Sequence, residues 1–211
     1  MQSLVSEIED VPQVDPQTAI GVDVGLKSLI TLSNGSAVSY PRYYVQEQQK
    51  LAVAQRNLSR KKKGSANRRK AKLKVAKINQ RVQNLRDNFL HLVSRELVDT
   101  ADLIVFENLN IPGMLKNHRL AKHIQDHRGK LIQFTQGKAA KAGKIVELVD
   151  VAYTSQKCSK CGIIVPKTLA DRVHKCPYCG LEMDRDLNAS LNIVTLGLRG
   201  RANRDTAKAG L

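Results

Sequence analysis

Three stretches near the C-terminus of the chain read Cys158-Ser159-Lys160-Cys161-Gly162, Cys176-Pro177-Tyr178-Cys179-Gly180 and Asp184-Arg185-Asp186-Leu187-Asn188. The first two are CxxCG motifs, in which two residues between the cysteines let both thiolates of a tight turn reach one ion. The glycine after each motif lets the backbone fold under that ion. The stretches therefore predict a small metal-binding unit placed directly before a candidate catalytic carboxylate.

All the cysteines of the chain lie in these two motifs, which are separated by 14 residues. Four thiolates complete a closed tetrahedral site, so one structural Zn²⁺ is expected. Two disulfides or a redox-active CxxC are the alternatives, but residues 1–10 do not resemble a signal peptide, which favours a reducing compartment. His174 is expected at the surface, because the cysteines already fill the site. The expected zinc ligands are Cys158, Cys161, Cys176 and Cys179.

The composition points to a polyanionic partner. The 211 residues include 35 Lys and Arg against 19 Asp and Glu, which gives a net charge of +16. This excess is larger than solubility requires, so a nucleic acid is the expected partner. Only 4% of the residues are aromatic, which predicts that phosphate contacts dominate over base stacking. No apolar stretch is long enough to cross a bilayer, so no membrane partner is expected.

The positive charge is concentrated at residues 48–86, where 14 Lys and Arg residues occur without one Asp or Glu. A solvated helix face normally mixes both signs of charge, so this segment is the expected nucleic-acid surface. The apolar spacing predicts a helix at 46–58, a turn at Gly64-Ser65 and a long helix that ends near Val98. We call residues 46–98 the basic helical region. The residues expected to hold a phosphate backbone are Arg56, Arg60, Lys61, Lys62, Lys63, Arg68, Arg69, Lys70, Lys72 and Lys74.

Short apolar segments on both sides of the basic helical region predict a sheet. Strands are expected at 19–25, 28–32 and 37–40, which form a meander, and at 102–106 and 144–149. A polar helical segment is expected between the last two strands. This order of strands and helices indicates a mixed α/β sheet.

Three acidic residues stand out by their positions in these segments. Asp23 lies within an apolar strand, Glu107 ends another strand, and Asp186 opens a helical segment. A carboxylate beside an apolar strand is costly unless a cation or hydrogen bonds compensate it. If the three converge, they would bind two divalent cations, which can activate water and stabilise the leaving oxygen of a phosphodiester. Each acid also has a simpler interpretation, as a turn residue, a surface residue and a helix N-terminal residue respectively.

Motifs along the chain resemble the TnpB/OrfB family of transposon-encoded, RNA-guided nucleases, which are related to type V CRISPR effectors. The resemblance runs from about Thr18 to Ile193, in the order of the family's motifs. Besides the two CxxCG motifs, it rests on the segments Gly21–Lys27, Lys61–Lys70, Ile104–Asn110, Tyr153–Cys158 and Arg185–Ser190.

The resemblance implies an RNase H-like nuclease domain of the RuvC type, with a basic helical insertion and a small inserted zinc ribbon. The nuclease core is expected at 19–156 and 182–198, and the zinc ribbon at 157–181. Residues 1–18 are expected to be the remnant of a missing upstream domain. Residues 199–211 are small, polar and basic, and they are expected to form a flexible tail.

The family's metal-binding acids correspond by motif to Asp23, Glu107 and Asp186, and the implied cofactors are two Mg²⁺ or Mn²⁺ ions. Asp184 is a rival for the third position. Residues two apart on a helix point to nearly opposite sides, so both are not expected to bind the same ions. The acid directly before Leu187-Asn188-Ala189 matches the family's motif, which selects Asp186.

The leading hypothesis is a Mg²⁺-dependent DNA endonuclease guided by an RNA from its own mobile element. DNA and that guide RNA are the expected partners, and the prokaryotic cytoplasm, in association with the nucleoid, is the expected location. The family's full-length members carry a large N-terminal portion for RNA binding and target recognition, whereas this chain begins about twenty residues before its first nuclease strand. The alternative is therefore a non-catalytic RNA- or DNA-binding remnant that regulates its own element. A strand transferase is disfavoured, because no tyrosine with paired histidines is present.

Overall fold

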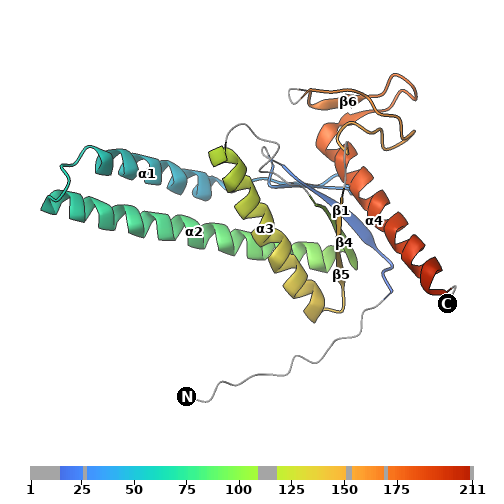
Figure 1. The fold of residues 1–211 in the computed structure, drawn as a ribbon, viewed down its shortest axis with the longest axis horizontal. Helices are drawn as coiled ribbons and strands as arrows, with labels where there is room; N and C mark the ends of the chain where they lie inside the picture. Colours follow the sequence, from blue (N-terminus) through green and yellow to red (C-terminus); the bar gives the residue numbers. More distant parts are fainter. Residues whose placement is uncertain (1–14, 26–27, 109–117, 151–153, 169–170, 210–211) are drawn as a thin grey trace, which may run out of the picture.

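A mixed five-stranded sheet lies at the centre of the computed structural model, with the strand order β3-β2-β1-β4-β5 (Figure 1). The strands are β1 Ala19–Val24, β2 Ile30–Leu32, β3 Ala37–Val38, β4 Leu103–Glu107 and β5 Ile145–Val149. β1 pairs antiparallel with β2 and parallel with β4, and β4 pairs parallel with β5. The predicted mixed α/β sheet is confirmed. The structure describes residues 15–25, 28–108, 118–150, 154–168 and 171–209, so most of the expected N-terminal remnant lies outside the described residues.

Helices cover both faces of the sheet, which explains why β4 is apolar along its length. Alternate residues of a strand point to opposite faces. Ile104 and Phe106 therefore pack in one core with residues of α2 and α3, while Leu103 and Val105 pack in a second core with Ile193 of α4. The helices named here are α2 Ala66–Thr100, α3 His118–Lys141 and α4 Arg185–Ala209.

Two glycines let α4 lie directly on the sheet. A Cβ atom at Gly21 of β1 would lie 2.1 Å from the backbone oxygen of Ser190, and one at Gly197 of α4 would lie 2.5 Å from a methyl carbon of Val105. No side chain fits at such distances, so glycine is required at both positions. This close packing fixes the position of α4, which carries Asp186, relative to β1 and β4.

The basic helical region forms a helical hairpin that projects away from the sheet (Figure 1). It consists of α1 (Arg42–Ser59) and the first half of α2, which lie side by side. Gly64 has a φ of 83°, and the Ser65 side chain accepts a hydrogen bond from the backbone N–H of Arg68 at 3.1 Å, which caps α2. The predicted helices and turn are confirmed, although each helix begins earlier than its apolar pattern indicated.

The prediction of a flexible tail at 199–211 is wrong for residues 199–209, which continue α4 as a helix. The reason is a contact with the sheet: Arg201 and Arg204 both form ion pairs with Glu147 of the edge strand β5. The last two residues lie outside the described part of the chain. None of the described helices combines the length and the apolar character that crossing a membrane requires.

A separate two-stranded antiparallel sheet, formed by β6 (Val173–Lys175) and β7 (Glu182–Asp184), lies at the N-terminal end of α4 (Figure 1). The prediction that His174 lies at the surface is wrong, since its side chain is fully buried. Because His174 is the middle residue of β6, its side chain points inward while its two neighbours point to solvent, and its Nδ1 atom contacts the Lys167 ammonium group.

Candidate metal centres and nucleic-acid surface

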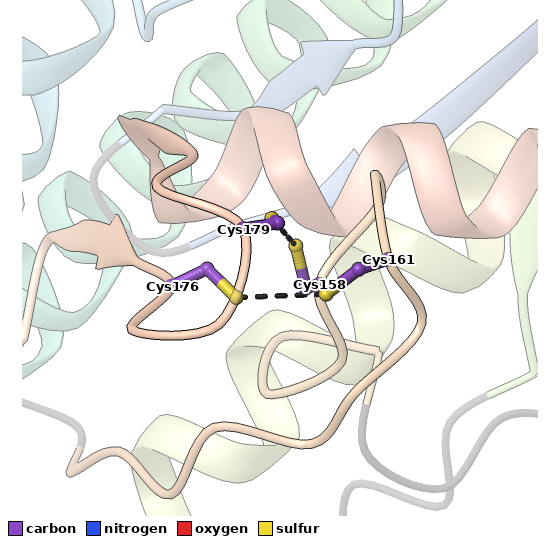
Figure 2. Close-up of side chains that lie close together, drawn as sticks. All are labelled: Cys158, Cys161, Cys176 and Cys179. Carbon is purple, nitrogen blue, oxygen red and sulfur yellow. Dashed lines mark hydrogen bonds between the residues drawn. The ribbon is translucent and has the colours of Figure 1, made fainter.

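The four cysteines converge on one point between the two CxxCG motifs (Figure 2). The Sγ atoms of Cys158 and Cys179 are 3.6 Å apart, as are those of Cys161 and Cys176. All four Sγ atoms lie within 4.8 Å of one another. Tetrahedral Zn–S bonds of about 2.3 Å place sulfur atoms about 3.8 Å apart, so this arrangement fits one zinc ion. Two disulfides do not fit, because every cysteine is free and an S–S bond requires about 2 Å.

Each CxxCG motif folds into the same hydrogen-bonded turn. In the first motif, the N–H of Cys158 donates to the carbonyl of Ile163 and the N–H of Gly162 donates to the carbonyl of Cys158, both at 2.9 Å. The second motif repeats these two hydrogen bonds at 2.8 and 3.0 Å. Gly162 and Gly180 have φ values of 78° and 72°, a region that favours glycine. The glycines therefore have the role that the sequence predicted for them.

The thiols do not ionise alike. Burial raises the pKa of Cys176, but the backbone N–H groups of Cys179 and Tyr178 and the neighbouring thiols together lower it to about 6. At Cys161 a backbone N–H lowers the pKa, while burial and the neighbouring thiols raise it to about 12. A lowered thiol pKa favours the thiolate form that binds a metal cation.

Asp23, Glu107 and Asp186 come together at one end of the sheet. Asp23 and Glu107 lie near the carboxyl ends of the adjacent parallel strands β1 and β4, and Asp186 lies in the first turn of α4. Burial raises the pKa of Asp23, and the charges of Asp186 and Glu107 raise it further, to about 7. The three acids are more loosely spaced than the cysteines, which form the one tight cluster of potential metal ligands among the described residues.

Glu107 is nearly enclosed by protein, with 7% of its surface exposed. Burial raises its pKa, while a hydrogen bond from the Thr154 hydroxyl to its Oε1 atom, at 3.0 Å, lowers it. The carboxylate is therefore fixed in one orientation by a buried donor. From the sequence, Thr154 belongs to the family-like segment Tyr153–Cys158, but the sequence does not indicate that it donates a hydrogen bond to Glu107.

Asp184 and Asp186 have different roles in the structure. The Asp184 carboxylate accepts hydrogen bonds from the backbone N–H groups of Asp186, at 2.8 Å, and Leu187, at 3.2 Å. It therefore caps the N-terminus of α4 and is exposed to solvent. Asp186 instead lies near Asp23, and its carboxylate forms an ion pair with Arg185 at 3.4 Å.

Arg128 of α3 is a charged residue of this site that the sequence did not reveal. It is 5% exposed, and its Nε atom has no hydrogen-bond partner within the described parts of the chain. Its positive charge lowers the pKa of Glu107 and of Asp23, and burial lowers its own pKa. A spacing signal was available, because Arg128 lies on the helix face of Leu131, Thr135 and Ala139, all of which are buried.

The basic residues predicted to hold a phosphate backbone lie along the helical hairpin, and all but Arg68 are exposed. The Arg68 guanidinium donates to the carbonyls of Leu58, at 3.1 Å, and Lys61, at 3.0 Å, and so closes the turn between α1 and α2. A groove of about 520 Å³ lies between the two helices, with an apolar floor from Val53, Ala54, Ala71 and Ile78 and with amide and ammonium groups around it. These groups come from Gln46, Gln49, Lys50, Asn57 and Lys74.

Sequence comparison relates the chain to proteins of mobile elements. The profile of the OrfB_IS605 family, described as "Probable transposase", matches residues 3–118, and the profile described as "Cas12f1-like, TNB domain" matches residues 129–193. A Streptomyces pristinaespiralis protein named "Putative RNA-guided DNA endonuclease" is 38% identical over 206 residues, which are 96% of this chain and 51% of that protein. The Escherichia coli K12 protein named "Putative RNA-guided DNA endonuclease InsQ" is 30% identical over 92% of this chain and 53% of that protein.

Structure comparison identifies the same arrangement in a cryo-EM structure described as a Cas12f1-sgRNA-target DNA complex. The TM-score is 0.63 with 20% sequence identity, over 88% of this chain and 51% of the Cas12f1 chain. This likeness supports the fold. The chain spans about half the length of the curated relatives that it matches.

Proposed function

This chain belongs to the TnpB/OrfB family, and on that premise we propose that it is a divalent-metal-dependent DNA endonuclease guided by RNA. The proposal includes a nuclease domain of the RuvC type, a zinc ribbon held by the four cysteines, and action on DNA in the prokaryotic cytoplasm. The observation that supports it most is the proximity of Asp186 and Glu107 to Asp23: burial raises the pKa of Asp23, and the charges of these two acids raise it further, to about 7.

The three carboxylates fit a site for two Mg²⁺ or Mn²⁺ ions. Hard cations prefer carboxylate oxygens, and the charges of Asp186 and Glu107 raise the pKa of the buried Asp23 despite the opposing charges of Arg185 and Arg128, so a bound cation would be stabilised here. When bound, such ions supply an activated water and stabilise the leaving oxygen of a phosphodiester. Among the protein groups, Arg128 helps to keep Asp23 and Glu107 ionised at neutral pH, because its charge lowers both pKa values.

The hairpin of α1 and α2 is the proposed surface for DNA or guide RNA. Residues 48–86 contain no acidic residue, and most of their Lys and Arg side chains are exposed, although Lys50 and Arg81 pair with Glu47. The groove between the helices adds amide groups. Ammonium and guanidinium groups bind phosphates in either nucleic acid, and they release condensed counterions when they do so.

The catalytic assignment is tested by two neighbouring aspartates. Asp186→Asn is expected to slow Mg²⁺-dependent cleavage of a single-stranded DNA oligonucleotide by at least about a hundredfold, because an amide does not supply the charge that holds the cation. Asp184→Asn is the matched control, since asparagine caps a helix as well as aspartate does, and it should cleave at the rate of the wild type. Cleavage is followed by gel electrophoresis with Mg²⁺ and with chelator.

Equal cleavage by Asp186→Asn and the wild type would overturn the assignment of Asp186. Salt-sensitive nucleic-acid binding without cleavage under any divalent metal would support the non-catalytic alternative, a binding protein that regulates its own element.

The hairpin is tested by the salt dependence of binding. The triple change Lys61→Ala, Lys62→Ala and Lys63→Ala should weaken binding of a double-stranded DNA and reduce the slope of log affinity against log salt by about two to three, since each lost phosphate contact removes about 0.9. Fluorescence anisotropy between 50 and 200 mM salt measures both quantities. Arg95→Ala is the control, because Arg95 is exposed on α2 but already pairs with Asp99 at 3.1 Å. An unchanged slope in the triple variant would exclude this surface.

A further inference from the structure

Asn192 of α4 is a buried polar residue with two hydrogen bonds to the segment that leads into the zinc ribbon. Its amide nitrogen donates to the backbone carbonyl of Thr154 at 2.9 Å and to that of Lys157 at 2.7 Å. Its side chain is almost fully enclosed, with 6% of the residue exposed. Without Asn192, the Thr154 carbonyl would lose this hydrogen bond to α4 in a place that water reaches poorly.

Asn188, one helical turn earlier, binds the same segment. Its amide nitrogen donates to the carbonyl of Lys157 at 2.7 Å, and its carbonyl oxygen accepts from the backbone N–H of Ser159 at 2.9 Å. Asn188 is fully buried. Two asparagines of α4 therefore hold residues 154–159, which we call the strap, from the end near Glu107 to the first CxxCG motif.

The strap also contacts the acidic site. Thr154 is 5% exposed, and its hydroxyl group donates to Oε1 of Glu107 at 3.0 Å. The backbone carbonyl of the same residue accepts from Asn192. A continuous path of hydrogen bonds thus runs from α4 through Thr154 to Glu107. The helix at the start of this path also carries Asp186.

We propose that Asn192 is a positioning residue, which acts through Thr154 to hold Glu107 in register with Asp186 for binding of divalent cations. The inference deepens the proposed function and rests on it for the identity of the site. Hydrogen-bonded partners that orient metal ligands typically change metal affinity by about 10- to 100-fold when they are removed. The asparagine does not contact the cation, so its effect should appear in affinity through the ligands that it orients.

Binding of Mn²⁺ to the zinc-loaded full chain, without nucleic acid, tests the proposal. Asn192→Ala and Thr154→Val should each weaken the Mn²⁺ affinity, measured by electron paramagnetic resonance, by about tenfold. Thr154→Ser keeps the hydroxyl group and should bind within about twofold of the wild type. Thr195→Ala is the control on α4, because Thr195 is exposed and its hydroxyl bonds only within the helix. Bound zinc should stay at the wild-type level in every variant that is compared.

The double variant Asn192→Ala with Thr154→Val separates a shared path from two independent defects. If the residues act through one another, its loss of Mn²⁺ affinity should match that of either single variant, whereas independent defects would multiply to about a hundredfold. Such multiplication would overturn the proposal. So would wild-type affinity in Thr154→Val, a variant that preserves the shape of the side chain even if Asn192→Ala disturbs folding.

These outcomes are distinguishable from failure of the proposed function. If the wild type binds Mn²⁺ at a site that Asp186→Asn removes but cleaves no DNA, the endonuclease proposal fails and the role of Asn192 stands. If the wild type has no Mn²⁺ site that depends on Asp186, the positioning proposal fails as well.

Discussion

Asp23→Asn is expected to stabilise the cation-free protein by about 2 kcal/mol at pH 8. The pKa of Asp23 is about 7 in the folded protein against an ordinary value of 3.8. The folded state therefore binds this proton more tightly than the unfolded state, so the free energy of unfolding falls as the pH rises from about 4 to 7. Each pKa unit corresponds to about 1.4 kcal/mol of folding stability, so the shift gives an upper bound of about 4 kcal/mol. Solvent screening of this partly exposed carboxylate reduces the expected effect to about half of that bound.

The same substitution should reduce Mg²⁺-dependent DNA cleavage by at least about a hundredfold. Removing only an outer partner of a metal ligand costs 10- to 100-fold, so the loss of a ligand should exceed that. A gain in stability combined with a loss of activity is typical of a residue kept for function.

Urea unfolding in the presence of chelator, at pH 5.5 and pH 8, measures the effect on stability. The difference between Asp23→Asn and the wild type should grow between these values and level off above pH 7. Asp102→Asn is a control of opposite sign. A hydrogen bond from the Thr18 hydroxyl lowers the pKa of Asp102, assisted by backbone N–H groups and Lys144, so the loss of its charge should destabilise the protein. Destabilisation by Asp23→Asn at pH 8 would contradict the buried acidic site.

The sheet, the long helices and the cysteine site could be predicted because their signals are local. An uninterrupted apolar segment at 103–106 indicates a strand covered on both faces, and apolar residues at helical spacing indicate where α2 packs. The two CxxCG motifs contain all four thiols and the glycines of their turns, so spacing alone was sufficient to predict that the thiols form one cluster. The convergence of the three acids was predictable only through the family resemblance, since these residues are separated by long stretches of chain.

The sequence predictions that failed, or could not be made, concern polar residues whose partners are distant in sequence. Arg201 and Arg204 appeared solvated, but their partner Glu147 lies on a strand more than fifty residues earlier. His174 is buried by a three-residue strand that is too short to produce a periodic pattern. Arg128 and Asn192 are buried beside the acids and the strap. Helical spacing indicates that Arg128 lies on a buried face, but it does not identify the acids that this residue faces.

Removal of zinc is expected to unfold the ribbon while the rest of the fold persists. The ribbon has almost no apolar core of its own, since Ile163, Ile164, Val173 and Tyr178 are all exposed. Among its described side chains, the buried ones are the two proposed ligands Cys158 and Cys176 and one histidine. Because so little apolar surface is buried, coordination of the metal has to supply most of the stability, and structural zinc contributes on the order of 10 kcal/mol in small zinc-binding peptides.

Hydrogen–deuterium exchange measures this effect residue by residue. With zinc bound, the N–H groups of Cys158 and Cys176 should be protected by their turns, and Cys176→Ser or a zinc chelator should abolish that protection. The amides of α2 should keep their protection from exchange, because α2 packs on the face of the sheet opposite to α4. Ser159→Ala is the control: it changes a residue of the first motif that is not a proposed ligand, and it should keep both the zinc and the protection.

Unchanged protection in Cys176→Ser would show that the ribbon folds without its metal. Loss in α2 as well would show that zinc stabilises the whole chain, since the strap and α4 connect the ribbon to the sheet.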